Sequence, residues 1–361
     1  MGITRVLIIK LPNNFLIMSI QITKDRSIGE NEPVFIISEI GSNHNRDKEL
    51  AYKLIDMSVD AGADAVKFQI YSAETLYSRD TPMHSGYDRP LWELIKDIET
   101  PREWIPELKE YCDDSNIIFF ATPFDFRAVD ELDSAEVDLY KIASFELVDL
   151  PLIEYTAKKG KPTIISTGLA DMEELDDAYR SFKKTGNDKL IFLQCASIYP
   201  SVPEIMNLRA METMGRAFGV PVGLSDHTPG IHISLAAVAM GGSVIEKHVT
   251  LDRRMKGPDH AFAIEPNELK NLVRQTREIE SAMGSGRKTG PSVKEMEYYE
   301  KARRSIHAKT KISCGEVITE DKLIMKRPGY GIRPKYIDFI VGRRAKEEIS
   351  EDQWITLDML D

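Results

Sequence analysis

Three ionisable residues interrupt a run that otherwise has the composition of a buried β-strand. The run is SVIEKHVT, residues 243–250, and it holds Glu246, Lys247 and His248 between apolar positions. Burying a charge without a partner is costly, so such residues usually have a role. His227 ends the preceding apolar run, one strand–helix–strand unit earlier. Because adjacent strands lie ~4.8 Å apart, imidazoles at matched strand ends could share one divalent cation. The alternative is that each histidine is a satisfied core residue.

Two lysines also fall within apolar runs and need anionic partners. Lys67 lies in DAVKFQI, and Lys141 lies in LYKIAS. Hydroxyl groups of the apolar runs would surround the two lysines and complete a polar bowl suited to a phosphate and a carboxylate. These groups belong to Thr122, Ser144, Ser166, Ser197 and Ser225. The alternative is that each lysine pairs with an acid of the same region, for which the candidates are Glu39, Glu146 and Glu246.

Eight short apolar runs carry these residues, and segments with helical periodicity separate them. The runs are residues 34–41, 64–70, 117–125, 139–144, 162–168, 190–197, 221–227 and 243–250. Their nearly continuous apolarity predicts parallel strands covered on both faces. Eight strands alternating with helices over roughly 250 residues predict an α/β fold, a (β/α)₈ TIM barrel. The alternative is a doubly wound open sheet, but no run leads into a GxGxxG turn.

The polar residues gather where such a barrel places its chemistry. Active sites of (β/α)₈ enzymes lie at the C-terminal ends of the strands, and polar residues end all eight predicted strands. Strand alternation puts Lys67 and Gln69 on one face of their strand. In the same way, Glu246 and His248 share one face of the strand at 243–250. The sequence therefore predicts a polar pit at this end of the barrel.

The chain divides into four predicted segments. They are an N-terminal extension and lead-in (1–30), the barrel (31–284), a Gly- and Ser-rich linker (285–300) and a small, mostly β domain (301–361). We expect Met18 to be the natural start, preceded by an ill-ordered extension. The small domain is near the size at which a core alone is marginal, so we expect it to need a partner surface.

The overall composition limits partners and compartment. The net charge of −11 argues against general nucleic-acid binding, which needs a basic surface. Residues 301–335 are instead rich in Lys and Arg, which indicates a solvated face or a site for an anion or acidic partner. Three scattered cysteines favour a reducing compartment, and no run approaches the ~20 apolar residues of a membrane span. We therefore expect a cytoplasmic protein.

Several ordered motifs resemble the sialic acid synthase family, which includes synthases of neuraminic, legionaminic, pseudaminic and spore-coat nonulosonic acids. The motifs of the barrel are FIISEIGSNHN, AVKFQ, YKIAS, STG, GLSDHT, IEKHVTLDR and GPDH. In the end domain, KRPGYGI is similar to the signature of the antifreeze-like SAF domain. The likeness spans residues 34 to 345, end domain included.

The resemblance implies a metal-dependent transferase that condenses phosphoenolpyruvate with N-acetylmannosamine or a related N-acylated amino sugar. Carbon 3 of phosphoenolpyruvate attacks the open-chain aldehyde, water adds at carbon 2, and phosphate leaves by C–O cleavage. The metal would be Mn²⁺, with Mg²⁺ or Co²⁺ as alternatives. His227 and His248 would hold it, so that it polarises the aldehyde.

The resemblance also assigns roles to the other polar residues. Phosphoenolpyruvate would be seated by Lys67, Thr122, Lys141, Ser144, Ser166, Ser197 and Ser225. The sugar would be lined by Gln69, Glu146, Tyr199 and Asp259. Glu39 would act beside the metal as binder or acid/base, so the catalytic residues would be Glu39, His248 and Asp259. In a domain-swapped homodimer, Arg327 would meet the sugar N-acyl group in the partner's site.

The acceptor sugar and the activity itself have alternatives. Residues 71–95 lack the Asn that relatives using N-acetylmannosamine carry, and Ser197 replaces an Asn of some members. One alternative is therefore a pseudaminic, legionaminic or spore-coat synthase that uses a trideoxy diacetamido hexose. A 3-deoxy-sugar-acid synthase would lack the end domain. A non-catalytic carbohydrate-binding barrel would not need the pit of charged residues.

Overall fold

The computed structural model describes residues 19–81 and 89–361. The expected start at Met18 and the extension before it lie outside these residues. The chain forms two compact units, one ending at Gly284 and the other beginning at Ser285. Each unit has its own hydrophobic core, so each is described by itself.

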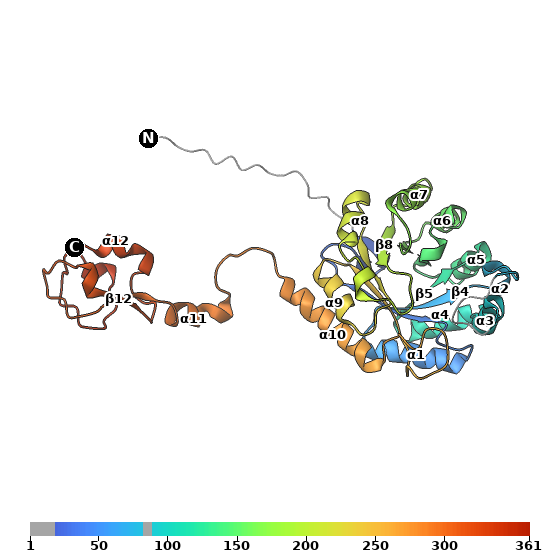
Figure 1. Ribbon diagram of the computed structural model, residues 1–361, viewed down its shortest axis with the longest axis horizontal. Helices are drawn as coiled ribbons and strands as arrows, with labels where there is room; N and C mark the ends of the chain where they lie inside the picture. The colour runs from blue at the N-terminus through green and yellow to red at the C-terminus, as the bar shows by residue number, and fades with distance from the viewer. Residues whose placement is uncertain (1–18, 82–88) are drawn as a thin grey trace. The chain divides into compact units, whose positions relative to one another are not determined.

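Eight parallel strands form one sheet in the first unit (Figure 1). They are β3 (Phe35–Gly41), β4 (Ala65–Ile70), β5 (Ile118–Pro123), β6 (Tyr140–Ile142), β7 (Thr163–Ser166), β8 (Leu190–Cys195), β9 (Val222–Asp226) and β10 (Val244–His248). The hydrogen-bonded order is β5-β4-β3-β10-β9-β8-β7-β6. Contacts between β5 and β6 close the ring. Each predicted apolar run contains one of these strands, and the TIM-barrel prediction is confirmed.

Helices alternate with the strands along the chain and surround them (Figure 1). They are α1 (Lys48–Ala61), α2 (Ala73–Leu76), α3 (Leu91–Ile98), α4 (Ile105–Asp114), α5 (Phe126–Ser134), α6 (Leu150–Ala157), α7 (Met172–Lys183), α8 (Ala210–Phe218), α9 (His232–Ala239) and α10 (Pro266–Met283). Val66 and Phe68 of β4 are buried in the core between strands and helices, with Leu54 of α1. Strand alternation therefore leaves Lys67, between them, on the inner face.

The second unit is built on a short antiparallel pair, β11 (Ser305–Ala308) and β12 (Leu323–Lys326), confirming a small domain with a β core. Its core includes Ile306, Ile312 and Ile349. The segment expected as a linker, 285–300, is partly helical, because it contains η4 (Val293–Glu295) and most of α11 (Met296–Lys301). A second short helix, α12 (Ile337–Ile340), follows the strands.

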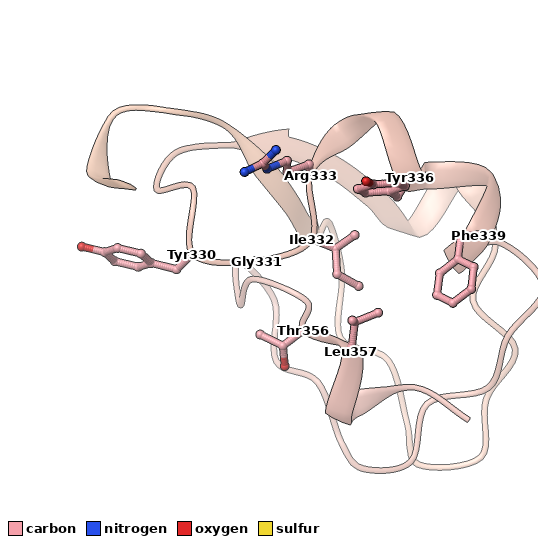
Figure 2. A pocket seen from close by; sticks show the side chains of 8 residues that line it. All are labelled: Tyr330, Gly331, Ile332, Arg333, Tyr336, Phe339, Thr356 and Leu357. Atoms are coloured by element: carbon pink, nitrogen blue, oxygen red, sulfur yellow. The ribbon is translucent and has the colours of Figure 1, made fainter. Parts of the chain in front are cut away.

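An open pocket of about 590 Å³ lies in the second unit. Figure 2 shows its lining, in which the apolar side chains of Ile332, Phe339 and Leu357 are prominent. Tyr336, Phe339 and Leu357 are each more than two-fifths exposed. The lining residues carry no carboxylate, and Arg333 supplies the charged side chain. The chemistry of the pocket suits an apolar contact.

The N-terminal end of the barrel is closed by a hairpin of β1 (Ile20–Thr23) and β2 (Arg26–Ile28). Ile20, Ile22 and Ile28 pack into the inner barrel core. The hairpin thus gives residues 19–28 a definite role, although they lie within the segment expected to be an extension and lead-in.

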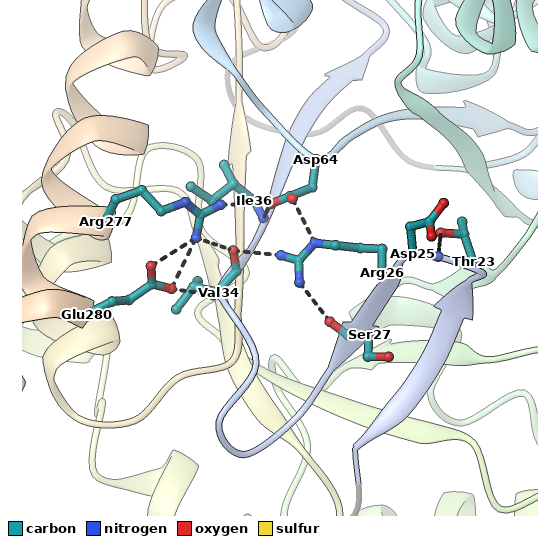
Figure 3. Close-up of polar contacts among 9 residues, drawn as sticks. All are labelled: Thr23, Asp25, Arg26, Ser27, Val34, Ile36, Asp64, Arg277 and Glu280. Atoms are coloured by element: carbon teal, nitrogen blue, oxygen red, sulfur yellow. Dashed lines mark hydrogen bonds and ion pairs between the residues drawn. The ribbon is translucent and has the colours of Figure 1, made fainter. Parts of the chain in front are cut away.

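An ion-pair network fastens this hairpin to the barrel (Figure 3). The Asp64 carboxylate lies 2.8 Å from Arg26 Nε and 3.3 Å from Arg277 Nη2. It also accepts a hydrogen bond from the Ile36 amide at 2.7 Å. Both arginines donate to the Val34 carbonyl, at 3.0 and 2.9 Å. The network joins β2, α10 and the starts of β3 and β4.

Candidate active site

The register of the central strands places the predicted residues on two neighbouring levels of the barrel. His248 of β10 pairs with Glu39 of β3, and Glu39 pairs with Lys67 of β4. On the other side of β10, Glu246 pairs with Ser225 of β9. All five lie in neighbouring parallel strands, and active sites of such barrels lie toward the C-terminal ends of the strands.

Two lysines and two glutamates alternate in the barrel interior. Lys67 Nζ lies 2.8 Å from Glu39 Oε2 and 3.7 Å from Glu246 Oε1. Lys141 Nζ lies 3.3 Å from the same Glu246 oxygen and donates to Ser166 Oγ at 2.7 Å. All four ionisable side chains are at most 5% exposed. The hypothesis that each lysine pairs with a barrel acid is therefore correct.

Hydroxyl groups complete the surroundings of the two ammonium groups. Thr122 accepts a hydrogen bond from Lys67 at 3.2 Å, and Ser225 donates to Glu246 at 3.1 Å. An ammonium group has three N–H donors, and among the described residues Lys141 uses two, for Ser166 and Glu246. The pairing therefore leaves Lys141 able to donate to a ligand.

Burial is the strongest influence on the pKa of each of these four groups. It raises the pKa of Glu39 and lowers that of Lys141. For Lys67, the nearby Glu246 and Glu39 outweigh burial and raise the pKa. For Glu246, Lys141 and Lys67 outweigh burial and lower the pKa. Lys67 and Glu246 thus form the charged centre of the network.

The two predicted metal-binding histidines do face one another. Their ring centroids are 5.4 Å apart. The Tyr199 ring lies 4.3 Å from the His227 ring, and the Phe262 ring lies 5.1 Å from that of His248. His227 Nδ1 is 3.1 Å from the Ala196 carbonyl, to which it would donate as the protonated nitrogen. That tautomer leaves Nε2 with a free lone pair.

The donor set suits a cation bound by two imidazoles. His248 Nδ1 is buried without a hydrogen-bond partner. Burial and the nearby His227 lower the pKa of His248 well below its ordinary value, which favours the neutral ligand form. Within residues 19–81 and 89–361, no group of three or more His, Cys, Asp or Glu side chains is arranged to hold a metal.

Asp259 and Glu39 meet beside the histidines. Asp259 Oδ2 lies 3.6 Å from His248 Nδ1, too long for a hydrogen bond. Burial, reinforced by Glu39, raises the pKa of Asp259 to about 7. Gln69 donates to Glu39 Oε1 at 2.7 Å. Gly41, which the sequence did not single out, sits against all three side chains, because a Cβ there would lie 3.2–3.5 Å from each.

A second glycine shapes the opposite side of the pit. The Gly168 amide donates to Ser144 Oγ at 3.0 Å. A Cβ at Gly168 would lie 2.2 Å from Ser197 Oγ and 2.9 Å from Ser144 Oγ, so any side chain there would displace these hydroxyl groups. Glu146 is close by in sequence; its Oε2 is buried without a partner, and burial raises its pKa to about 7. The buried Glu146 oxygen without a partner, with its raised pKa, indicates a binding surface.

Some polar residues at the strand ends serve other purposes. Asn43 donates to the Val249 carbonyl, and His44 contacts Thr100 in the helix layer. Arg327 is exposed and belongs to the second unit, which is described by itself.

Comparison with known proteins gives a family for both units. Residues 54–288 match the NeuB family, and residues 303–361 match the SAF domain. An uncharacterized protein of Methanocaldococcus jannaschii is 42% identical, with 93% of this chain and 97% of that protein covered. The N,N'-diacetyllegionaminic acid synthase of Campylobacter jejuni is 40% identical, with 89% and 98% covered. Human N-acetylneuraminate-9-phosphate synthase is 36% identical, with 95% and 97% covered.

A solved structure agrees with these relatives. The sialic acid synthetase of Leptospira borgpetersenii superposes with a TM-score of 0.72 at 38% identity, covering 80% of this chain and 97% of that one. The family match spans more than half of the chain, and the most similar relatives are covered almost completely. The chain therefore belongs to the NeuB family, whose members include sialic, legionaminic and pseudaminic acid synthases, and it carries a SAF domain at its C-terminal side.

Proposed function

We propose that this chain condenses phosphoenolpyruvate with an N-acylated amino sugar and releases phosphate. The observation that carries the proposal is the buried network of Lys67, Lys141 and hydroxyl groups directly beside the paired histidines. One side of the pit offers ammonium and hydroxyl donors for an anion. The other offers imidazoles and carboxylic acids for a carbonyl group.

Phosphoenolpyruvate would lie against the donor side. Its phosphate and carboxylate would be held by Lys67 and Lys141, together with Thr122, Ser144, Ser166, Ser197 and Ser225. The ammonium groups would stabilise the phosphate that leaves, because a charged donor in a water-poor site favours the developing negative charge. The Gly168 amide and Ser144 support the same surface, since their hydrogen bond fixes the hydroxyl beside Ser197.

A divalent cation, Mn²⁺ first and Mg²⁺ or Co²⁺ as alternatives, would be held by His227 and His248. When bound, such an ion supplies a Lewis acid that polarises a carbonyl group. Glu39 and Asp259 lie on the same side, where either can bind a sugar hydroxyl or exchange a proton with it. Gln69, Glu146 and Tyr199 would complete the lining of the sugar.

The acceptor is proposed to be a diacetamido trideoxy hexose, with N-acetylmannosamine and its phosphate as alternatives. Two N,N'-diacetyllegionaminic acid synthases, of Campylobacter jejuni and Legionella pneumophila, are each 40% identical to this chain. Human N-acetylneuraminate-9-phosphate synthase is 36% identical. Residues 71–95 also lack the Asn that relatives using N-acetylmannosamine carry, which favours the diacetamido sugar.

The proposal is tested by measuring phosphate release and product mass with each of these acceptors, in the presence of Mn²⁺. We expect one acceptor to give stoichiometric phosphate and a product heavier by the elements of pyruvate. If none of these acceptors leads to phosphate release, and the chain still binds a carbohydrate, a non-catalytic barrel would be supported instead.

We further propose that the site is completed in a domain-swapped homodimer, with Arg327 of one chain serving its partner's barrel. Mixing two inactive variants tests this directly. In a swapped dimer of Lys141→Met with Arg327→Ala, one site has both residues intact, so mixing and reassembly should restore part of the activity. A mixture with no more activity than its components would contradict the swap.

A further inference from the structure

A buried ion pair stands on the outer face of the two strands that carry the histidines. Asp226 precedes His227 at the end of β9, and Lys247 precedes His248 at the end of β10. Successive side chains of a strand point to opposite faces, so the ion pair and the histidine pair lie back to back across the barrel wall. Asp226 and Lys247 are register partners in the sheet.

Both side chains of this pair form hydrogen bonds in addition to their ion pair. Lys247 Nζ lies 2.9 Å from Asp226 Oδ2, and the two side chains are 1% and 0% exposed. Asp226 Oδ1 accepts from both the amide and the hydroxyl of Thr228, at 2.9 and 2.8 Å, and Oδ2 accepts from Ser234 at 2.5 Å. Lys247 also donates to the Thr228 carbonyl. The pair therefore holds both the strand ends and the turn that follows β9.

These contacts hold His227 in place, because they fix the residues before and after it in the chain. Residue 226 carries the carboxylate, and residue 228 is fixed through its amide, hydroxyl and carbonyl. The carbonyl of His227 itself accepts from the Ser201 amide at 3.0 Å. On the other strand, Lys247 is covalently joined to His248, so a shift of the ion pair would move both rings.

We propose that Asp226 and Lys247 are positioning residues that set the separation of His227 and His248 for a shared divalent cation. This rests on the proposed metal role of the two histidines. Residues that orient metal ligands without touching the metal typically change metal affinity 10–100-fold when altered. A buried ion pair can also be purely structural, and replacing both charges together is then well tolerated.

The test uses the full chain and the double variant Asp226→Asn/Lys247→Met, which removes both charges and leaves no buried ion unpaired. Mn²⁺ binding is titrated by electron paramagnetic resonance, and Co²⁺ binding is followed by visible absorption. The matched control is Arg26→Met/Asp64→Asn, an ion pair at the opposite end of the barrel that holds no histidine. Unfolding free energy is measured for all three proteins.

We expect the Asp226/Lys247 variant to bind Mn²⁺ at least tenfold more weakly and to show an altered Co²⁺ spectrum, while the control binds like the parent. Mn²⁺ affinity within twofold of the parent, with lowered stability only, would overturn the proposal. If the parent itself binds no metal, the proposed metal role fails. A crystal structure of the double variant then decides the positioning claim, because unchanged His227 and His248 rings would refute it.

Discussion

The two ends of the barrel carry networks of the same chemistry but of opposite character. At the N-terminal end, Arg26, Asp64 and Arg277 are 16–35% exposed and bond to backbone groups as well as to each other. At the C-terminal end, Lys67 and Glu246 are 3–5% exposed, and among the described residues their side chains form ion pairs and hydrogen bonds with other side chains.

The difference lies in what each network leaves unsatisfied. The N-terminal network ties strand starts to the hairpin and α10, and its acceptors are used. Beside the C-terminal network, Glu146 Oε2, Glu246 Oε2 and His248 Nδ1 are buried without partners. Buried polar atoms are normally paired, so the leftover capacity marks the surface where a ligand binds. Ion pairs at the two ends of the barrel therefore have different roles.

The largest effect is expected at the C-terminal network. Lys141→Met removes an ammonium group that would hold the leaving phosphate, so phosphate release should fall roughly 10²–10³-fold. Circular dichroism should show an unchanged fold, because Glu246 keeps its contact with Lys67. Activity within threefold of the parent would show that Lys141 does not belong to the anion site.

A smaller loss is expected where a glycine shapes the same surface. Gly168→Ala would place a methyl group 2.2 Å from Ser197 Oγ, so Ser197 and Ser144 must move. Because a misplacement of about 1 Å can cost up to 10²-fold, we expect the KM for phosphoenolpyruvate to rise about 10- to 100-fold. The KM for the sugar is the internal control. If the two constants change equally, Gly168 does not belong to the phosphoenolpyruvate side.

At the N-terminal end, the effect should fall on stability alone. Asp64→Asn weakens charge-assisted contacts to Arg26 and Arg277, which should lower the unfolding free energy by about 2 kcal/mol. Activity at a temperature where the variant is folded should stay within twofold. A large activity loss in the folded variant would erase the contrast between the two ends.

The smallest effect is a pH dependence at Glu146. Folding raises its pKa from 4.5 to about 7, so the folded state binds the proton more tightly. The resulting destabilisation is absent below pH 4.5, grows as the pH rises to 7, and is constant above. Glu146→Gln should therefore be more stable than the parent at pH 8 and equally stable at pH 4. Denaturant unfolding at both pH values measures this, and equal differences would contradict the assigned burial.

Much of the fold followed from periodicity. All eight strands were predicted because parallel strands covered on both faces have continuous apolar runs. The inward direction of Lys67 followed from Val66 and Phe68 on either side. The hairpin of residues 20–28 was missed, although Ile20, Ile22 and Ile28 have the period-two spacing of a strand pair.

The site was predictable only where spacing along the chain decides the geometry. The two histidines could be paired from their matched strand ends. Strand alternation could also have placed Asp226 and Lys247 outside the pit, since each neighbours an inward residue. Gly41 and Gly168 could not be found in this way, because their role depends on side chains that approach from other strands.

The most direct measurement is a crystal structure of the full chain with phosphoenolpyruvate. The account predicts that its phosphate or carboxylate lies within hydrogen-bond distance of Lys141 Nζ and Ser166 Oγ, with carbon 3 directed toward His227 and His248. Phosphoenolpyruvate bound away from both lysines, or bound equally well by the Lys141→Met variant, would contradict the account.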